Sequence, residues 1–176
     1  MGRKSKVREL AETFFGALGL ALVLRATMAE ACWIPTPSMA PTLEVGDRLV
    51  VEKLSYHFHP PRRGDIVLFN PPQTLAEYGL YTQSFWVKRV IGLPGERIAV
   101  REGKVLIDGK ELSEPYLEEH PLYHYPETVI PEGMVFVMGD NRNNSADSHL
   151  WGALPIKNIV GRAQFCIWPL SRLGAL

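Results

Sequence analysis

The sequence has few cysteines and no excess of charge of either sign, and both facts narrow its function. Only two cysteines occur in 176 residues, Cys32 and Cys166, and they form no C-x-x-C pair. A zinc site or a thioredoxin-type redox site is therefore not expected, and two free thiols are expected rather than a disulfide. Basic and acidic residues number 19 each. A nucleic-acid partner usually needs a basic surface, so none is expected here.

The sequence also lacks internal repeats and any alternation of strands with long helices, which argues against Rossmann and TIM architectures. Beyond Trp33, no ten-residue stretch has a helical period. Short β-branched and aromatic runs separated by glycine and proline predict a mainly β body instead. These runs cover residues 48–56, 64–70, 84–93, 97–109, 133–140 and 159–170. Residues 71–83 and the acidic, aromatic segment 113–128 are predicted to be loops.

The N-terminal segment is basic and then apolar, but its uncharged run is short. Four basic residues precede the run 13–24, which Arg25 interrupts. At 1.5 Å per residue this run spans only about 18 Å, whereas the hydrocarbon core of a bilayer needs about 30 Å. A full span must therefore extend to about Trp33, with Arg25 snorkelling outward. Three interpretations stay open: a cleavable signal ending near Ala29-Glu30-Ala31, a buried amphipathic helix, and an uncleaved anchor whose basic end is cytoplasmic.

Three polar features stand out in the β body, and each has an ordinary alternative. Ser38 lies among prolines in the segment 34–43, and a serine that prolines hold in a fixed backbone is a candidate nucleophile. A serine between prolines is nevertheless more often an ordinary loop residue. Lys88 has mostly apolar neighbours in its run, so burial would lower its pKa, although most lysines are exposed and paired. The segment 139–149 is dense in short polar side chains, which are typical of tight turns and only weakly indicate a calcium loop.

Taken together and in order, the segments Ile-Pro-Thr-Pro-Ser-Met-Ala-Pro-Thr-Leu (34–43), Gly-Asp-Ile-Val-Leu-Phe (64–69), Val-Lys-Arg-Val-Ile-Gly-Leu-Pro-Gly-Glu (87–96) and Gly-Asp-Asn-Arg-Asn-Asn-Ser-Ala-Asp-Ser-His (139–149) resemble the type I signal peptidases. The resemblance covers about residues 34–162, and the sequence of residues 141–152 is similar to that of the cyanobacterial and plastid branch. It implies an antiparallel, coiled β-barrel body with a small β-hairpin subdomain at about 97–133, preceded by one transmembrane helix.

The resemblance also implies roles for individual residues. Ser38 corresponds to the nucleophile and Lys88 to the general base, and no cofactor or metal is implied. The oxyanion hole corresponds to the Ser38 amide and the Thr36 hydroxyl. Ser145 corresponds to the serine that orients the lysine amine, and Asp147 braces the site from behind.

One position departs from the family pattern. Many members have an arginine two residues after the aspartate of the last segment, whereas this chain has His149. We expect His149 to hold Asp147 structurally and to transfer no proton. A Ser-His-Asp triad is not expected, because Lys88 and Ser145 already fill the required roles and all five histidines lie outside the Ser38 and Lys88 segments.

The same resemblance implies the substrate and the place of work. Signal peptides would bind extended along strand edges and present small residues at the −1 and −3 positions. Candidates for the −1 pocket lie close to the catalytic residues in sequence: Ile34, Met39, Leu43, Trp86 and Val87. Residues 1–33 would be a cytoplasmic tail and membrane anchor, and residues 34–176 a monomeric extracytoplasmic domain at a plasma or thylakoid bilayer, where tethering raises the effective concentration at the cleavage site.

Two other functions remain possible from the sequence. A self-cleaving Ser-Lys regulator of the repressor type shares the fold plan but would need a DNA-binding N-terminal domain. A membrane-tethered β domain that only binds peptides would not need Ser38 or Lys88. An inactive family member is disfavoured because Thr36, Ser38, Lys88 and Ser145 are all present.

Overall fold

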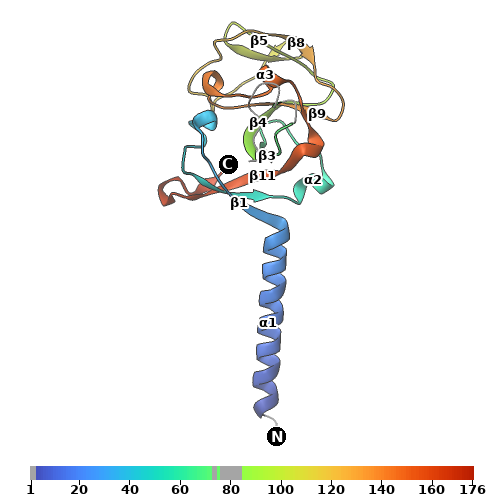
Figure 1. Ribbon diagram of the computed structural model, residues 1–176, viewed down its shortest axis with the longest axis vertical. Helices are drawn as coiled ribbons and strands as arrows, with labels where there is room; N and C mark the ends of the chain where they lie inside the picture. Colours follow the sequence, from blue (N-terminus) through green and yellow to red (C-terminus); the bar gives the residue numbers. More distant parts are fainter. Residues whose placement is uncertain (1–2, 73–74, 76–84) are drawn as a thin grey trace.

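The computed structural model describes residues 3–72, 75 and 85–176, and shows a β body from which one long helix projects (Figure 1). This helix, α1 (Arg3–Met28), continues directly into strand β1 (Ala29–Trp33). Within these described residues, no helix combines the length and the apolar character that crossing a membrane requires. The prediction that the helix extends to about Trp33 is wrong, because residues 29–33 pair in antiparallel register with residues 48–52.

The main sheet has eight strands, and all of its pairings are antiparallel, which confirms the predicted β class. Its path is β1-β2-β11-β3-β4-β9-β10, and β12 pairs with β11. Closure into a barrel, which the resemblance implies, remains a prediction. The bounds of the strands after β1 are β2 (Arg48–Glu52), β3 (Ile66–Phe69), β4 (Trp86–Gly92), β9 (Met134–Met138), β10 (Leu154–Pro155), β11 (Ile159–Trp168) and β12 (Gly174–Ala175).

A second sheet of four strands lies within residues 97–129, at the end of the body far from α1 (Figure 1). Its order is β7-β6-β5-β8, and its strands are β5 (Arg97–Arg101), β6 (Lys104–Ile107), β7 (Lys110–Glu111) and β8 (Tyr125–Val129). Strand β8 lies in a segment predicted to be a loop. The four residues after Tyr125 are all exposed, so the strand has no alternation of apolar and polar residues that the sequence could reveal.

Helices after β1 are single turns in the described part of the chain, as the absence of a helical period predicts. The two α-helices are α2 (Ser55–Phe58) and α3 (Ser148–Trp151), and the 3₁₀ helices are η1 (Pro37–Met39), η3 (Arg142–Asn144), η4 (Ile156–Asn158) and η5 (Leu170–Arg172). Most of the predicted loop 71–83 lies outside the described residues. Both cysteines pair in register with Leu49, on opposite sides of β2. Two strand spacings of about 4.8 Å separate their backbones by more than a disulfide allows, and both thiols are free.

Three apolar clusters hold the sheets together, and one of them lies beneath the segment 34–43. It joins Ile34, Met39 and Leu43 to buried residues of β2, β3, β4 and β11. The continuously buried strand β3, Ile66–Phe69, pairs with β4 and fixes the position of that strand. Strand β4 also pairs with β9, which runs directly into the polar loop 139–149. The sheet therefore brings together the segment 34–43, strand β4 and the loop 139–149, although the three are distant in sequence.

Candidate active site

Ser38 sits in the short 3₁₀ helix η1, which begins four residues after the end of β1. Pro37 begins this turn, and its fixed φ suits the first helical position. The preceding chain is pinned by two backbone hydrogen bonds, from the Ile34 amide to the Asp47 carbonyl at 2.9 Å and from the Gly46 amide to the Ile34 carbonyl at 2.9 Å. Met39 is buried in the core beneath the turn. The Ser38 side chain is thus held by stiff backbone on one side and packing on the other.

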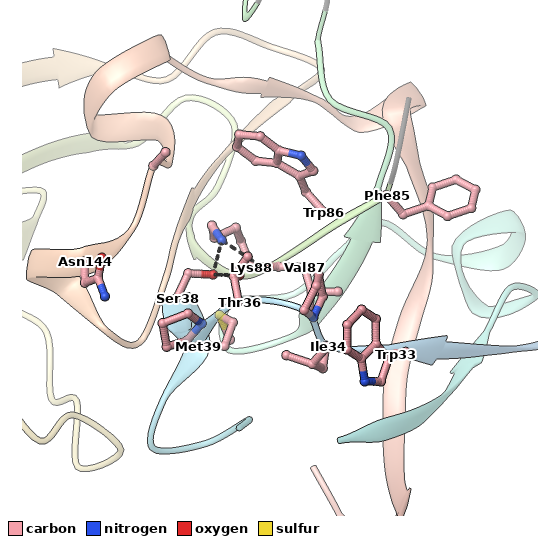
Figure 2. Close-up of a pocket in the computed structure, with 13 residues that line it drawn as sticks. Trp33, Ile34, Thr36, Ser38, Met39, Phe85, Trp86, Val87, Lys88 and Asn144 are labelled. Carbon is pink, nitrogen blue, oxygen red and sulfur yellow. Dashed lines mark hydrogen bonds between the residues drawn. The ribbon is translucent and has the colours of Figure 1, made fainter. Parts of the chain in front are cut away.

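Lys88 comes from the centre of β4 and meets Ser38 across the site (Figure 2). Its Nζ lies 2.6 Å from the Ser38 Oγ and 3.1 Å from its neighbour's carbonyl, Val87 O. The lysine is only 4% exposed, and the Trp86 ring lies beside it with the centroid 5.8 Å from Nζ. This low exposure confirms the predicted dry environment of Lys88. A charged amine is rarely buried to this degree unless an ion pair compensates its charge.

The surroundings of Lys88 favour a neutral amine. Burial lowers its pKa from 10.5 to about 8, and the negative charges of Asp147 and then Asp140 act against that shift. A neutral amine can accept a proton from a hydroxyl, whereas an ammonium group cannot. At pH 7 the lowered pKa leaves about one molecule in ten with a neutral Lys88, roughly 300 times the fraction at a pKa of 10.5.

Thr36 places a second hydroxyl next to the first. Its Oγ1 lies 3.2 Å from the Ser38 Oγ, and the residue itself is exposed at the rim of the site. The threonine precedes η1 with extended backbone, so its side chain points toward the same space as the serine (Figure 2).

Asp147 accepts hydrogen bonds from both ends of the loop 139–149. It is the N-cap of α3, where its Oδ1 accepts the backbone amide of His149 at 3.2 Å, as aspartate commonly does at this position. Its Oδ2 accepts the Gly139 amide at 2.9 Å, and its Oδ1 also accepts the His149 Nδ1 at 2.7 Å. The predicted contact between His149 and Asp147 is therefore present. That His149 transfers no proton remains a prediction.

Ser145 lies in the same loop, but the structure gives its hydroxyl no partner. Its Oγ is buried and, among the described residues, makes no hydrogen bond. The Lys88 amine is bound instead by Ser38 and the Val87 carbonyl. The role of Ser145 in orienting the amine thus remains a prediction.

A cavity of about 530 Å³ opens in front of the Ser38 hydroxyl and the Lys88 amine. Four of the five residues predicted for the −1 pocket line it: Ile34, Met39, Trp86 and Val87. Leu43 does not, and this prediction is wrong. Its amide bonds to the Met39 carbonyl at 2.9 Å, and its side chain is fully buried in the core cluster.

Several lining residues were missed by the sequence reasoning. Trp33 and Phe85 form an aromatic side of the cavity (Figure 2), and Asn144 and Ala146 reach it from the loop after β9. Each of the four lies within two residues of a position already singled out, which is the signal that could have found them. A second missed feature is the buried ion pair between Arg89 and Asp140, with contacts of 2.8 and 2.6 Å.

The arrangement is that of a hydroxyl nucleophile beside a buried amine base, on an antiparallel β frame. A family model described as signal peptidase, peptidase S26, matches residues 7–168. The chain is 56% identical over 160 residues to "Probable signal peptidase I-1" of Synechocystis sp., covering 91% of this chain and 82% of that protein. It is 42% identical over 169 residues to "Thylakoidal processing peptidase 1, chloroplastic" of Arabidopsis thaliana, covering 94% and 50%.

A crystal structure of a signal peptidase I from Enterococcus faecalis is 31% identical, with a TM-score of 0.48, and covers 59% of this chain and 97% of that one. The chain belongs to the peptidase S26 family of signal peptidases. The resemblance drawn from the four sequence segments, including its cyanobacterial and plastid character, is thereby confirmed.

Proposed function

We propose that this protein is a signal peptidase I that cleaves exported preproteins with Ser38 as nucleophile and Lys88 as general base. One observation carries the assignment of these two residues. The Ser38 Oγ and the Lys88 Nζ lie 2.6 Å apart, both buried, at the floor of a cavity large enough for several peptide residues. Hydrogen-bond reach between nucleophile and base is what this chemistry requires.

The proton transfers within the proposed active site involve only these two side chains and water. The neutral Lys88 amine takes the hydroxyl proton as the Ser38 Oγ attacks the scissile carbonyl carbon. The resulting ammonium gives that proton to the departing amine, which leaves an ester between Ser38 and the signal peptide. Lys88, neutral again, then activates a water molecule that hydrolyses the ester.

The negative oxygen of the tetrahedral intermediate needs fixed donors. The Thr36 hydroxyl, 3.2 Å from the nucleophile, and the Ser38 amide are the candidates. Removal of one such donor typically costs about 10²–10³ in rate. Ser145 would steady the lysine amine, since its buried hydroxyl has a free hydrogen-bonding capacity within the described site.

The cavity shape fits a signal peptide in extended conformation. Its walls are mainly apolar, from Ile34, Met39 and Val87, and they end close to the catalytic pair. A narrow apolar site accepts small residues and rejects large ones by steric clash. The substrate backbone would pair with the chain around Ser38 and with the residues leading into β4.

The pH dependence of cleavage tests the proposed base. We expect kcat/KM to rise about tenfold per pH unit below pH 8 and to level off above it, because only the neutral Lys88 amine accepts the serine proton. The measurement is single-turnover cleavage of a preprotein with an Ala-x-Ala site between pH 5 and 10, in detergent. A flat profile through pH 6–9, with the protein folded throughout, would contradict Lys88 as the base.

We also propose that the N-terminal residues up to the end of α1 at Met28 anchor the chain in a bilayer as a single span, with the basic end in the cytoplasm and the catalytic body outside. The support is the order of basic residues, the apolar run 13–24 and the direct passage of α1 into β1. Membranes carrying the full-length protein should retain it through alkaline carbonate extraction. Leu18→Arg should release most of it, since a charge in the run costs about 3 kcal/mol, whereas Glu12→Gln should not. Release of the unaltered protein would contradict the anchor.

A further inference from the structure

Two buried carboxylates act on the Lys88 amine, and each of them has its own basic partner. Asp140 accepts two hydrogen bonds from Arg89, from Nε at 2.8 Å and Nη2 at 2.6 Å. Asp147 accepts the His149 Nδ1 at 2.7 Å. Asp140 and Asp147 are 1% and 0% exposed, so loss of a basic partner leaves a buried charge that is less well compensated.

Each of these basic partners is covered by a tyrosine ring. The Arg89 guanidinium carbon lies 4.1 Å from the centroid of the Tyr116 ring. The His149 imidazole is stacked on the Tyr123 ring, with centroids 4.1 Å apart and planes 15° from parallel. Both tyrosines come from one stretch of the chain, residues 114–123, hereafter the tyrosine segment. Its sequence had indicated only an acidic, aromatic loop.

The tyrosine segment is fastened to the loop 139–149 by bonds of its own. Glu114 forms a two-pronged ion pair with Arg142, at 2.9 and 2.7 Å, and both side chains are buried. Arg142 Nε in turn donates to the Gly139 carbonyl at 3.0 Å. At the other end of the segment, the Leu122 amide donates to the Asn143 side-chain oxygen at 2.9 Å. These contacts fix both tyrosine rings relative to the loop 139–149.

We propose that Tyr116 and Tyr123 are positioning residues for the cleavage reaction, since each ring holds a basic side chain against one of the two carboxylates that act on Lys88. This inference rests on Lys88 being the base, as proposed above. The tyrosine segment is then part of the catalytic apparatus rather than a plain connection between β7 and β8 of the second sheet.

The direction of the effect follows from charge. When the Tyr123 ring is lost, the His149 ring can turn away, and Asp147 then keeps only the backbone amides of Gly139 and His149 as donors. The less compensated carboxylate favours the ammonium form of Lys88, so that a higher pH is needed to obtain the neutral amine. The charged and titratable groups around this site in the described structure are Lys88, Arg89, Glu114, Tyr116, Tyr123, Asp140, Arg142, Asp147 and His149.

The decisive experiment compares pH profiles of full-length variants at position 123. Tyr123→Leu should move the rising limb of kcat/KM upward by about half a pH unit, which lowers kcat/KM at pH 7 about threefold. Tyr123→Phe should keep the limb in place, because the Tyr123 hydroxyl makes no hydrogen bond in the described structure and the stacked ring is retained. Tyr116→Leu should move the limb in the same direction as Tyr123→Leu.

A matched control separates positioning from general stability. Tyr125 follows the tyrosine segment, and its ring packs against Phe136 in the core, with centroids 5.1 Å apart. Tyr125→Leu should lower the melting temperature and leave the pH limb unmoved. If Tyr123→Leu behaves in the same way, Tyr123 only fills space and the proposal is overturned.

Folding and the proposed mechanism are checked separately. Should Tyr123→Leu fail to fold, Tyr123→Met keeps most of the volume without a planar face, and the same shift is expected of it. An unmoved limb in Tyr123→Met would overturn the proposal. Failure of the mechanism itself has a different signature, because Ser38→Ala would then retain cleavage whatever is done at position 123.

Discussion

Replacing Lys88 with methionine is expected to abolish cleavage while leaving the folded protein more stable at neutral pH. Loss of a nucleophile or its base costs at least about 10⁴ in kcat/KM when the two act as a unit. Methionine has a similar length and no charge, so it fills the same space beside Ser38 and Trp86. Its thioether cannot take the serine proton, and the cavity should otherwise keep its shape.

The gain in stability follows from the lowered pKa of Lys88. The folded state holds the lysine proton with a pKa of about 8, whereas the unfolded chain holds it near 10.5. The unfolded state therefore binds more protons between these values, so stability rises with pH from 8 to 10.5. Below pH 8 the cost stays constant, at about 3 kcal/mol. Removing the amine removes this cost, which should appear as a higher melting temperature at pH 7.

The measurement pairs cleavage of an Ala-x-Ala preprotein with thermal unfolding of the same samples. Ser38→Ala should lose activity to the same degree and, with both changes together, the loss should not increase further. Lys104→Met, at an exposed position of strand β6, should change neither cleavage nor the lysine-linked stability. Cleavage surviving in Lys88→Met or in Ser38→Ala would sink the proposed dyad.

The main sheet and the two side chains proposed to be catalytic were within reach of sequence reasoning. Residues 66–69 and 86–92 are nearly continuous buried runs, which a central strand requires, and their flanking glycines and prolines mark the ends. Ser38 and Lys88 are unusual for local reasons, a serine between prolines and a lysine among apolar residues. Each alone is better explained as a loop serine or an exposed lysine. Only the four segments, taken together and in order, favoured a catalytic role for both residues.

The contacts behind the catalytic pair could not be predicted in the same way. Tyr123 stacks on His149, which lies 26 positions further along the chain. Arg142 donates to Glu114, which lies 28 positions earlier. No periodicity links such positions, because the partners come from irregular chain. Strand β1 was missed for a related reason: the apolar pattern of residues 29–33 suits either the end of a helix or an edge strand, and pairing with β2 decides between them.

Replacing Gly139 with alanine is expected to lower kcat/KM by about 10² or more, a large effect although smaller than loss of the dyad. A methyl group there would lie 2.6 Å from the Ser145 Cβ and would collide with the Ser145 Oγ and the Ser38 carbonyl oxygen. One of these contacts is backbone of the nucleophile itself, so the clash cannot be relieved by turning a side chain. Ser38 must move away from Lys88, and a displacement of about 1 Å from productive geometry can cost 10² or more.

The control for Gly139→Ala is Gly161→Ala, which produces a clash of similar size in strand β11 of the main sheet. A methyl group at Gly161 would meet the Glu52 carbonyl and lie 2.8 Å from the Val51 Cγ1, and neither residue lines the catalytic cavity. Both variants should lower the melting temperature, since each forces backbone apart in a packed sheet. Only Gly139→Ala should lose activity at temperatures where the protein is still folded. Equal losses of activity in the two variants would mean that stability, and not the 2.6 Å approach of Ser38 to Lys88, governs the rate.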